Sequence, residues 1–275
     1  MQTAVCQWCF PASLSVFDAM ATARECGFDG FEVAIGISTY VALDSSATSL
    51  AEIRKHAEAL GLSLSGGATG IGWQHPLTSN KRVRRDKGCE LTTRAVEVAA
   101  ELGLETLLIV PGMVNTETHY DDAFRNGVNS IQSILPRAEG LGVSLAVENV
   151  WNNFLLNPEE LRQFVDQCGS ARAGIYLDIG NVILYGYPEK WIQTLKGRIL
   201  GVHINDFKKG MSKGNGKGFV MPGEGDVDWP HVLTALRSVG YAGPLTIEYE
   251  PQAGGTGTRL RQALSRLKLI QTLKA

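Results

Sequence analysis

The fold is decided by a stretch near the middle of the chain, residues 142–181, which reads GVSLAVENVWNNFLLNPEELRQFVDQCGSARAGIYLDIGN. Two short apolar runs, 143–148 and 173–178, flank a segment with the punctuation of a helix. Asn157 is a suitable N-cap, Pro158 suits the first helical position, and the two acids that follow favour the positive end of the helix dipole. The stretch therefore predicts a strand, a helix and a second strand that runs parallel to the first.

The same alternation continues along the whole chain of 275 residues. Further strand-like runs lie at about 3–9, 29–35, 62–67, 105–110, 199–205 and 243–249, and segments of helical period such as 14–26 and 80–103 separate them. Glycines follow apolar helical segments, as expected for left-handed helix ends, at Gly27, Gly61, Gly103, Gly142 and Gly240. The glycines at 66–70 fit neither common phosphate-binding pattern, which disfavours a doubly wound sheet. We expect a single α/β domain over residues 1–275, a (β/α)8 TIM barrel.

Composition and charge exclude several other classes of protein. The chain has 44% hydrophobic and 20% charged residues, which is typical of a globular domain with a sizeable core. A net charge of −2 argues against nucleic acid as a partner. No signal peptide and no membrane span is recognisable, so we expect a cytoplasmic protein without a membrane partner. Five scattered cysteines, including the Cys6–Cys9 pair, are expected to be ordinary reduced thiols.

Four residues that suit metal binding stand at the ends of the last four predicted strands: Glu148, Asp178, His203 and Glu248. In a barrel these strand ends meet on one rim, where active sites lie. Any one of them could be a cap, an ion-pair partner or a hydrogen-bonded core residue. Three carboxylates together would repel one another, and a divalent cation removes that repulsion. We therefore predict one divalent metal ion, with Mn²⁺ preferred and Mg²⁺, Co²⁺ or Zn²⁺ also compatible with this donor set.

The sequence resembles the sugar-phosphate isomerase/epimerase superfamily, which has a xylose isomerase-like barrel. The resemblance rests on the segments 146–150 (AVENV), 177–182 (LDIGNV), 202–206 (VHIND), 222–228 (PGEGDVD) and 246–248 (TIE), and is strongest to ketose and pentulose-5-phosphate 3-epimerases. It implies that the four strand-end residues bind the metal and that Glu148 and Glu248 also act as acid and base. The implied enzyme is a metal-dependent 3-epimerase of a ketose or ketose phosphate, which abstracts a proton beside the carbonyl through a metal-stabilised cis-enediolate.

Residues on the substrate side are also predicted. Asn181 and Lys209 stand where free-ketose 3-epimerases commonly carry a histidine and an arginine, which favours a phosphorylated or otherwise different substrate. The loop after the seventh strand contains Lys208, Lys209, Lys213 and Lys217, and barrels often bind phosphate in this region. Further predicted contacts to the sugar are the aromatic residues Trp8 and Trp151 and, in the loop after the third strand, His75.

Other functions remain open. The same barrel serves aldose–ketose isomerases, such as one acting on hydroxypyruvate, and inosose dehydratases or isomerases. A phosphodiesterase that resembles endonuclease IV would need more histidines than the five in this chain, and the intact quartet argues against a binding protein without catalysis. The expected partner is a small sugar or sugar phosphate, and the resemblance implies a homodimer or homotetramer.

Overall fold

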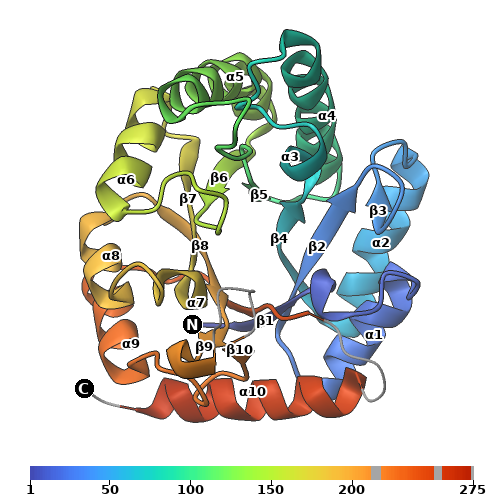
Figure 1. Ribbon diagram of the computed structural model, residues 1–275. Coiled ribbons are helices and arrows are strands. Elements are labelled where there is room, and N and C mark those ends of the chain that lie inside the picture. Colours follow the sequence, from blue (N-terminus) through green and yellow to red (C-terminus); the bar gives the residue numbers. More distant parts are fainter. Residues whose placement is uncertain (212–217, 251–255, 274–275) are drawn as a thin grey trace.

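Eight parallel strands form a closed barrel, as predicted. The computed structural model describes residues 1–211, 218–250 and 256–273. Within these ranges neighbouring strands pair around the ring, and the pairing of the first with the second and the last strand closes it (Figure 1). In order, the barrel strands are β1 (Thr3–Cys6), β2 (Gly30–Gly36), β4 (Ser63–Thr69), β5 (Thr106–Ile109), β6 (Ser144–Glu148), β7 (Ala173–Asp178), β8 (Ile199–Ile204) and β11 (Leu245–Ile247).

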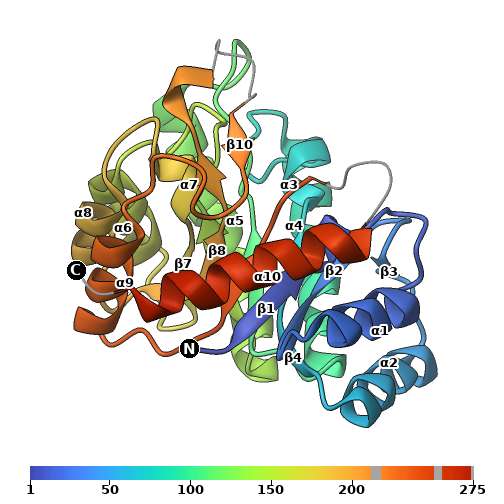
Figure 2. The same cartoon turned by 90° about the horizontal axis from the view of Figure 1, so that it is seen from below.

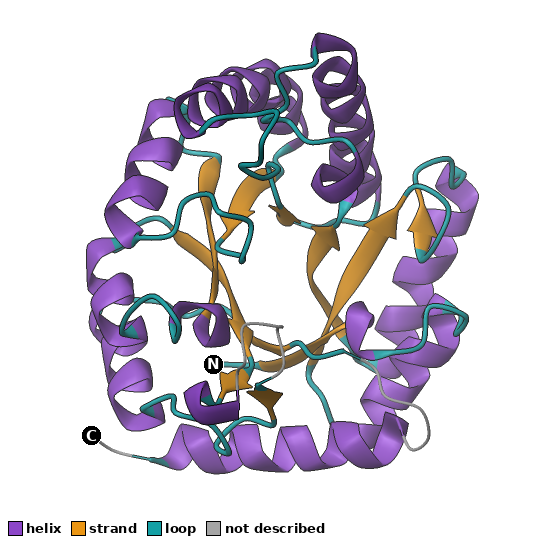
Figure 3. Cartoon of the chain, viewed as in Figure 1, coloured by secondary structure: helices purple, strands orange, loops and turns teal. Residues whose placement is uncertain are grey.

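Helices form an outer ring around the barrel (Figure 3). In chain order, the longer ones within the described ranges are α1 (Val16–Cys26), α2 (Ala47–Leu60), α4 (Arg82–Glu101), α5 (Tyr120–Leu141), α6 (Pro158–Gln167), α8 (Pro188–Thr194), α9 (Trp229–Ser238) and α10 (Thr256–Thr272). Asn157 caps α6 by accepting a hydrogen bond from the Glu160 N–H, as predicted. Gly27 and Gly142 end α1 and α5 in the left-handed conformation, with φ of 95° and 75°. None of the described helices is long and apolar enough to cross a membrane.

The first strand is shorter than the sequence predicts. Residues 7–9 leave the sheet and form the 3₁₀ turn η1 (Gln7–Cys9). In this turn the Gln7 side chain faces β2, and its Oε1 accepts a hydrogen bond of 3.0 Å from the Ala34 N–H. The Gln7 side chain therefore satisfies a backbone N–H of β2 that a longer first strand would have paired with its own backbone.

Small and large side chains pack together inside the barrel. A buried cluster there contains Cys6, Ala68, Leu108, Ala146 and Tyr176. The Tyr176 ring needs Gly201 on the neighbouring strand, because a Cβ atom at that position would lie 2.3 Å from a ring carbon. The missing side chain at Gly201 therefore leaves room inside the barrel for the Tyr176 ring, which packs against the predicted ligand His203.

Short elements cover the rim at the carboxyl ends of the strands (Figure 2). They are β3 (Val41–Ala42), α3 (Ile71–Gln74), α7 (Ile179–Val182), η2 (Lys209–Met211) and the antiparallel pair β9 (Asp206–Phe207) and β10 (Phe219–Val220). The buried Asp206 carboxylate holds the loop after β10 in place. It accepts N–H hydrogen bonds from Phe207, Gly223, Val227 and the indole of Trp229.

Candidate metal centre

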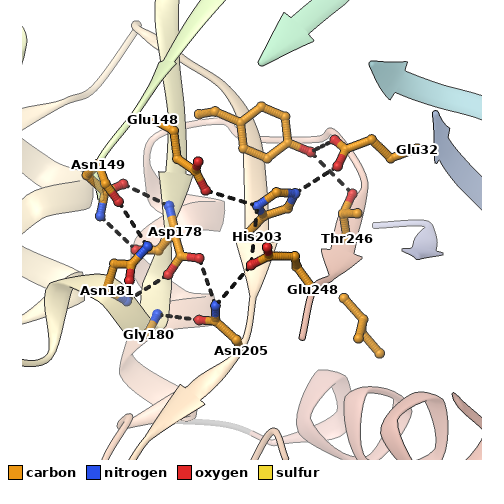
Figure 4. A network of polar contacts seen from close by, with 12 residues as sticks. Glu32, Glu148, Asn149, Asp178, Gly180, Asn181, His203, Asn205, Thr246 and Glu248 are labelled. Atoms are coloured by element: carbon orange, nitrogen blue, oxygen red, sulfur yellow. Dashed lines mark hydrogen bonds and ion pairs between the residues drawn. The ribbon is translucent and has the colours of Figure 1, made fainter. Parts of the chain in front are cut away.

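The four predicted ligands converge at the carboxyl ends of β6, β7, β8 and β11. Glu148 and Asp178 are the last residues of β6 and β7, His203 lies in β8, and Glu248 follows β11. Ligand atoms of Glu148, Asp178 and His203 lie within 4.8 Å of one another. His203 Nδ1 lies 3.2 Å from Glu148 Oε1 and 3.9 Å from Glu248 Oε2, so both carboxylates face the same ring nitrogen (Figure 4).

Burial differs among the four residues. Asp178 and His203 have no exposed surface, and Glu148 is buried. The Glu248 side chain keeps 26% of its surface exposed. Glu248 is therefore the member of the quartet most open to solvent, and so to an incoming substrate.

The electrostatics of this cluster suit a cation. Burial raises the pKa of Asp178 well above its usual range, and the nearby Glu248 and Glu148 raise it further. Burial also raises the pKa of Glu248 to about 7; Glu148 and Glu32 add to this, while His203 opposes it. In the described part of the chain, His203 is the only cationic partner in an ion pair with these acids. Three carboxylates and one imidazole nitrogen thus form a donor set that fits a hard divalent cation.

A backbone N–H and an amide side chain hold the Asp178 carboxylate in place. Its Oδ1 accepts from the Asn181 N–H at 2.7 Å, and its Oδ2 accepts from Asn205 Nδ2 at 2.7 Å. Asn205 Nδ2 also lies 3.4 Å from Glu248 Oε2, so one amide group links two of the predicted ligands. Asn149 pairs with the backbone of Asp178, accepting from its N–H and donating to its carbonyl.

Gly180 makes this arrangement sterically feasible. Its N–H donates to Asn205 Oδ1 at 2.8 Å. A Cβ atom on residue 180 would lie 2.1 Å from the same oxygen. Position 180 therefore needs glycine, because the Asn205 amide packs directly against the backbone there.

The predicted substrate contacts Asn181 and Trp151 lie together beside the quartet. Asn181 is half-buried, and its Nδ2 donates to the Asn149 carbonyl at 3.0 Å. The Trp151 indole donates to the Asn181 carbonyl at 3.0 Å. The Trp151 ring stacks on Phe219 and meets Phe207 edge to face, with centroids 5.1 Å apart in both cases. These residues form an aromatic wall next to β7, and their contact with a sugar stays a prediction.

The other predicted substrate residues are more scattered. Trp8 is half-buried and packs against the cluster inside the barrel. His75 follows α3, and no hydrogen bond or ion pair among the described residues joins it to the quartet. Lys209 is exposed at the rim, with Nζ 5.9 Å from the centroid of the Tyr187 ring. Lys213 and Lys217 lie outside the described residues.

Sequence reasoning missed two residues below the quartet. Glu32, in the middle of β2, is completely buried, and its Oε2 lies 2.8 Å from His203 Nε2. Burial alone would raise the pKa of Glu32, but His203 and the hydroxyl of Tyr176 outweigh it and hold this pKa below its usual range. Tyr176 donates to Glu32 Oε1. An acid inside an otherwise apolar strand, FEVAI, was the available signal, because a buried charge needs a partner.

Comparison with known proteins assigns the chain to a family. Residues 20–270 match the family described as the xylose isomerase-like TIM barrel. The chain belongs to this family. Among relatives, the uncharacterized protein MJ1311 of Methanocaldococcus jannaschii is 28% identical over 183 residues. An L-ribulose-5-phosphate 3-epimerase, UlaE of Salmonella paratyphi A, is 27% identical over 177 residues. Both matches cover 63% of this chain and 60% of the relative.

Solved structures of this xylose isomerase-like barrel agree over nearly the full length. A D-psicose 3-epimerase crystallised in the presence of D-fructose superimposes with a TM-score of 0.81. The match covers 98% of this chain and 99% of that one, at 20% sequence identity. At this sequence identity the likeness establishes the fold and confirms the predicted (β/α)8 barrel. The activity has to be argued from the site.

Proposed function

We propose that this chain is a divalent-metal-dependent 3-epimerase that acts on a ketose phosphate or a free ketose. The observation that carries the proposal is the convergence of Glu148, Asp178 and Glu248 on His203. The names of relatives in the same family, such as the L-ribulose-5-phosphate 3-epimerase UlaE, support the reaction class.

Glu148 and Glu248 are the proposed acid and base. A C–H bond beside a carbonyl becomes acidic when the developing negative charge on oxygen is stabilised, and a divalent cation held by the quartet would supply that stabilisation as a Lewis acid. One glutamate takes the proton from one face of the carbon, and the other delivers a proton to the opposite face. The two carboxylates come from different strands, Glu148 from β6 and Glu248 from the end of β11, and both face the Nδ1 atom of His203, which supports these roles (Figure 4).

A phosphorylated substrate is the first choice. Lys209 is exposed at the rim in the loop after β8, and barrels often bind phosphate in the loops that follow the seventh and eighth strands. The aromatic wall of Trp151, Phe207 and Phe219 stands beside the quartet and would pack against the carbon chain of the sugar.

The test is an exchange experiment in D₂O with Mn²⁺ present. L-ribulose 5-phosphate and D-fructose are incubated separately with the protein, and deuterium at C3 and C1 is followed by NMR. We expect deuterium at C3 together with the 3-epimer. Glu148→Gln and Glu248→Gln should each reduce the rate by about 10²–10⁴-fold. The matched control is Glu90→Gln, on the exposed face of α4, where Glu90 forms a surface ion pair with Lys87.

The pattern of label separates the alternatives. Deuterium at C1 with an aldose product would assign an aldose–ketose isomerase, since the same two carboxylates can move a proton between neighbouring carbons. A separate incubation with an inosose tests the remaining alternative, since loss of water from it would assign a dehydratase. Exchange that persists at the wild-type rate in both glutamate variants would refute the proposed roles of Glu148 and Glu248.

A further inference from the structure

A chain of polar side chains runs across the inside of the barrel below the quartet. Glu32 Oε2 lies 2.8 Å from His203 Nε2, and the Tyr176 hydroxyl donates to Glu32 Oε1. The same hydroxyl lies 3.4 Å from Thr246 Oγ1. All four side chains are buried. They come from β2, β7, β8 and β11, and Glu32 lies on the other side of the His203 ring from Glu148 and Glu248 (Figure 4).

The two ring nitrogens of His203 face different partners. Nδ1 faces Glu148 and Glu248, and Nε2 faces Glu32. A nitrogen that binds a metal must offer a free lone pair, so the proton of a neutral ligating imidazole sits on the other nitrogen. For His203 to be a ligand of the quartet, the proton must therefore be on Nε2, and an acceptor must face it inside the barrel.

Glu32 is suited to be that acceptor. Its Oε1 already accepts from Tyr176, which leaves Oε2 for Nε2 of His203. Cys6, Glu32 and His203 also form a second compact group of potential metal ligands. Both oxygens of Glu32 are already engaged, Oε1 by Tyr176 and Oε2 by His203, and the Tyr176 ring packs against the His203 ring with centroids 4.5 Å apart. This arrangement favours a hydrogen-bonded support for His203 over a second metal site.

We propose that Glu32 is a positioning residue, which fixes His203 with its proton on Nε2 and its lone pair on Nδ1 and thereby sets the affinity of the quartet for a divalent metal. The inference rests on the proposed function, because it assumes a metal in the quartet. Glu32 acts only through His203. Carboxylates that support a ligating histidine in this way typically contribute about 10–100-fold to metal affinity.

Replacing one oxygen of Glu32 by an amide group tests the idea. In Glu32→Gln, the Tyr176 hydroxyl still donates to the remaining oxygen, so the amide N–H₂ group faces Nε2 of His203. While it faces Nε2, that group can only donate, which favours the histidine proton on Nδ1, where it competes with metal binding. In the double variant Glu32→Gln with Tyr176→Phe, the glutamine is free to turn its oxygen towards Nε2. The second substitution should therefore restore part of the affinity lost in the first.

The experiment measures Mn²⁺ dissociation constants from the EPR signal of free Mn²⁺. We expect Glu32→Gln to bind roughly 10–100-fold more weakly than the wild type, Tyr176→Phe to bind within a few-fold of it, and the double variant to bind more tightly than Glu32→Gln. A residue that only fills space would give losses that add, without rescue. Additive losses, or unchanged affinity in Glu32→Gln, would overturn the inference.

A second measurement locates the ring proton of His203 directly and needs no variant at position 32. In the Mg²⁺-loaded wild-type protein with ¹⁵N-labelled histidine, NMR should show His203 with its proton on Nε2; a His203→Asn sample identifies its signals. A proton on Nδ1 would refute the inference. If wild-type Mn²⁺ binding is absent or survives Glu148→Gln, the proposed function fails; if binding needs Glu148 and is indifferent to Glu32, only this inference fails.

Discussion

Removing metal should make the stability of the folded protein fall as the pH rises from about 5 to about 8. Asp178, Glu248 and His203 all have a pKa above its ordinary value in the metal-free fold. A group of this kind stabilises the fold fully below its pKa in the unfolded chain, and the contribution is lost as the pH rises through its pKa in the folded state. All three groups therefore act in the same direction.

The contribution of Glu248 can be worked out from the structure. Its pKa rises from 4.5 to about 7, chiefly because of burial. At about 1.4 kcal/mol for each pH unit, this gap corresponds to about 3 kcal/mol. The side chain keeps 26% of its surface exposed, and solvent screening lowers the figure to roughly 2 kcal/mol. We expect at least this loss in the free energy of unfolding between about pH 5 and about pH 8.

Urea denaturation followed by circular dichroism, with EDTA present, gives the free energy of unfolding at each pH. Carboxylates with lowered pKa, such as Asp29 and Glu97, change protonation below this window and do not mask the trend. With saturating Mn²⁺ the dependence should reverse, because protons and metal compete for the same groups. Glu248→Gln is the matched control. In EDTA, its free energy of unfolding should fall between pH 5 and pH 8 by roughly 2 kcal/mol less than that of the wild type. A free energy of unfolding that stays constant or rises with pH in EDTA would refute this reasoning.

Three further predictions concern residues around the site. Asp206→Asn removes the charge from a buried acceptor of four N–H groups and should lower the free energy of unfolding by about 2–3 kcal/mol in urea denaturation. Lys209→Ala should raise KM about tenfold for a phosphorylated ketose and leave KM for a free ketose unchanged in steady-state assays, if the loop binds phosphate. Phe164→Ala empties part of an aromatic cluster with Phe124 and Phe154, which should cost about 3–5 kcal/mol in thermal denaturation while the folded protein keeps its Mn²⁺ affinity.

The sequence was sufficient to predict the barrel and the quartet because both follow from local patterns. Apolar runs placed all eight strands, and the charged residue at the end of a run, such as Glu148 or Asp178, marked the rim. The geometry of parallel strands then brings residues from distant parts of the chain together.

Other features depend on contacts that a one-dimensional pattern does not contain. Glu32 lies inside a strand, where a search of strand ends does not look, and its role follows from its distance to His203. The turn at residues 7–9 includes a contact of the Gln7 side chain with Ala34. The roles of Asn149 and Asn205, although both stand in recognisable segments, follow from hydrogen bonds to Asp178 across the rim.

The most direct test of the central claim is anomalous diffraction from a crystal of the protein grown with Mn²⁺. The account predicts one strong peak per chain, about 2.0–2.3 Å from oxygens of Glu148, Asp178 and Glu248 and from Nδ1 of His203. A peak on the other side of the imidazole ring, between Cys6 and Nε2, or no peak within reach of the quartet, would contradict it.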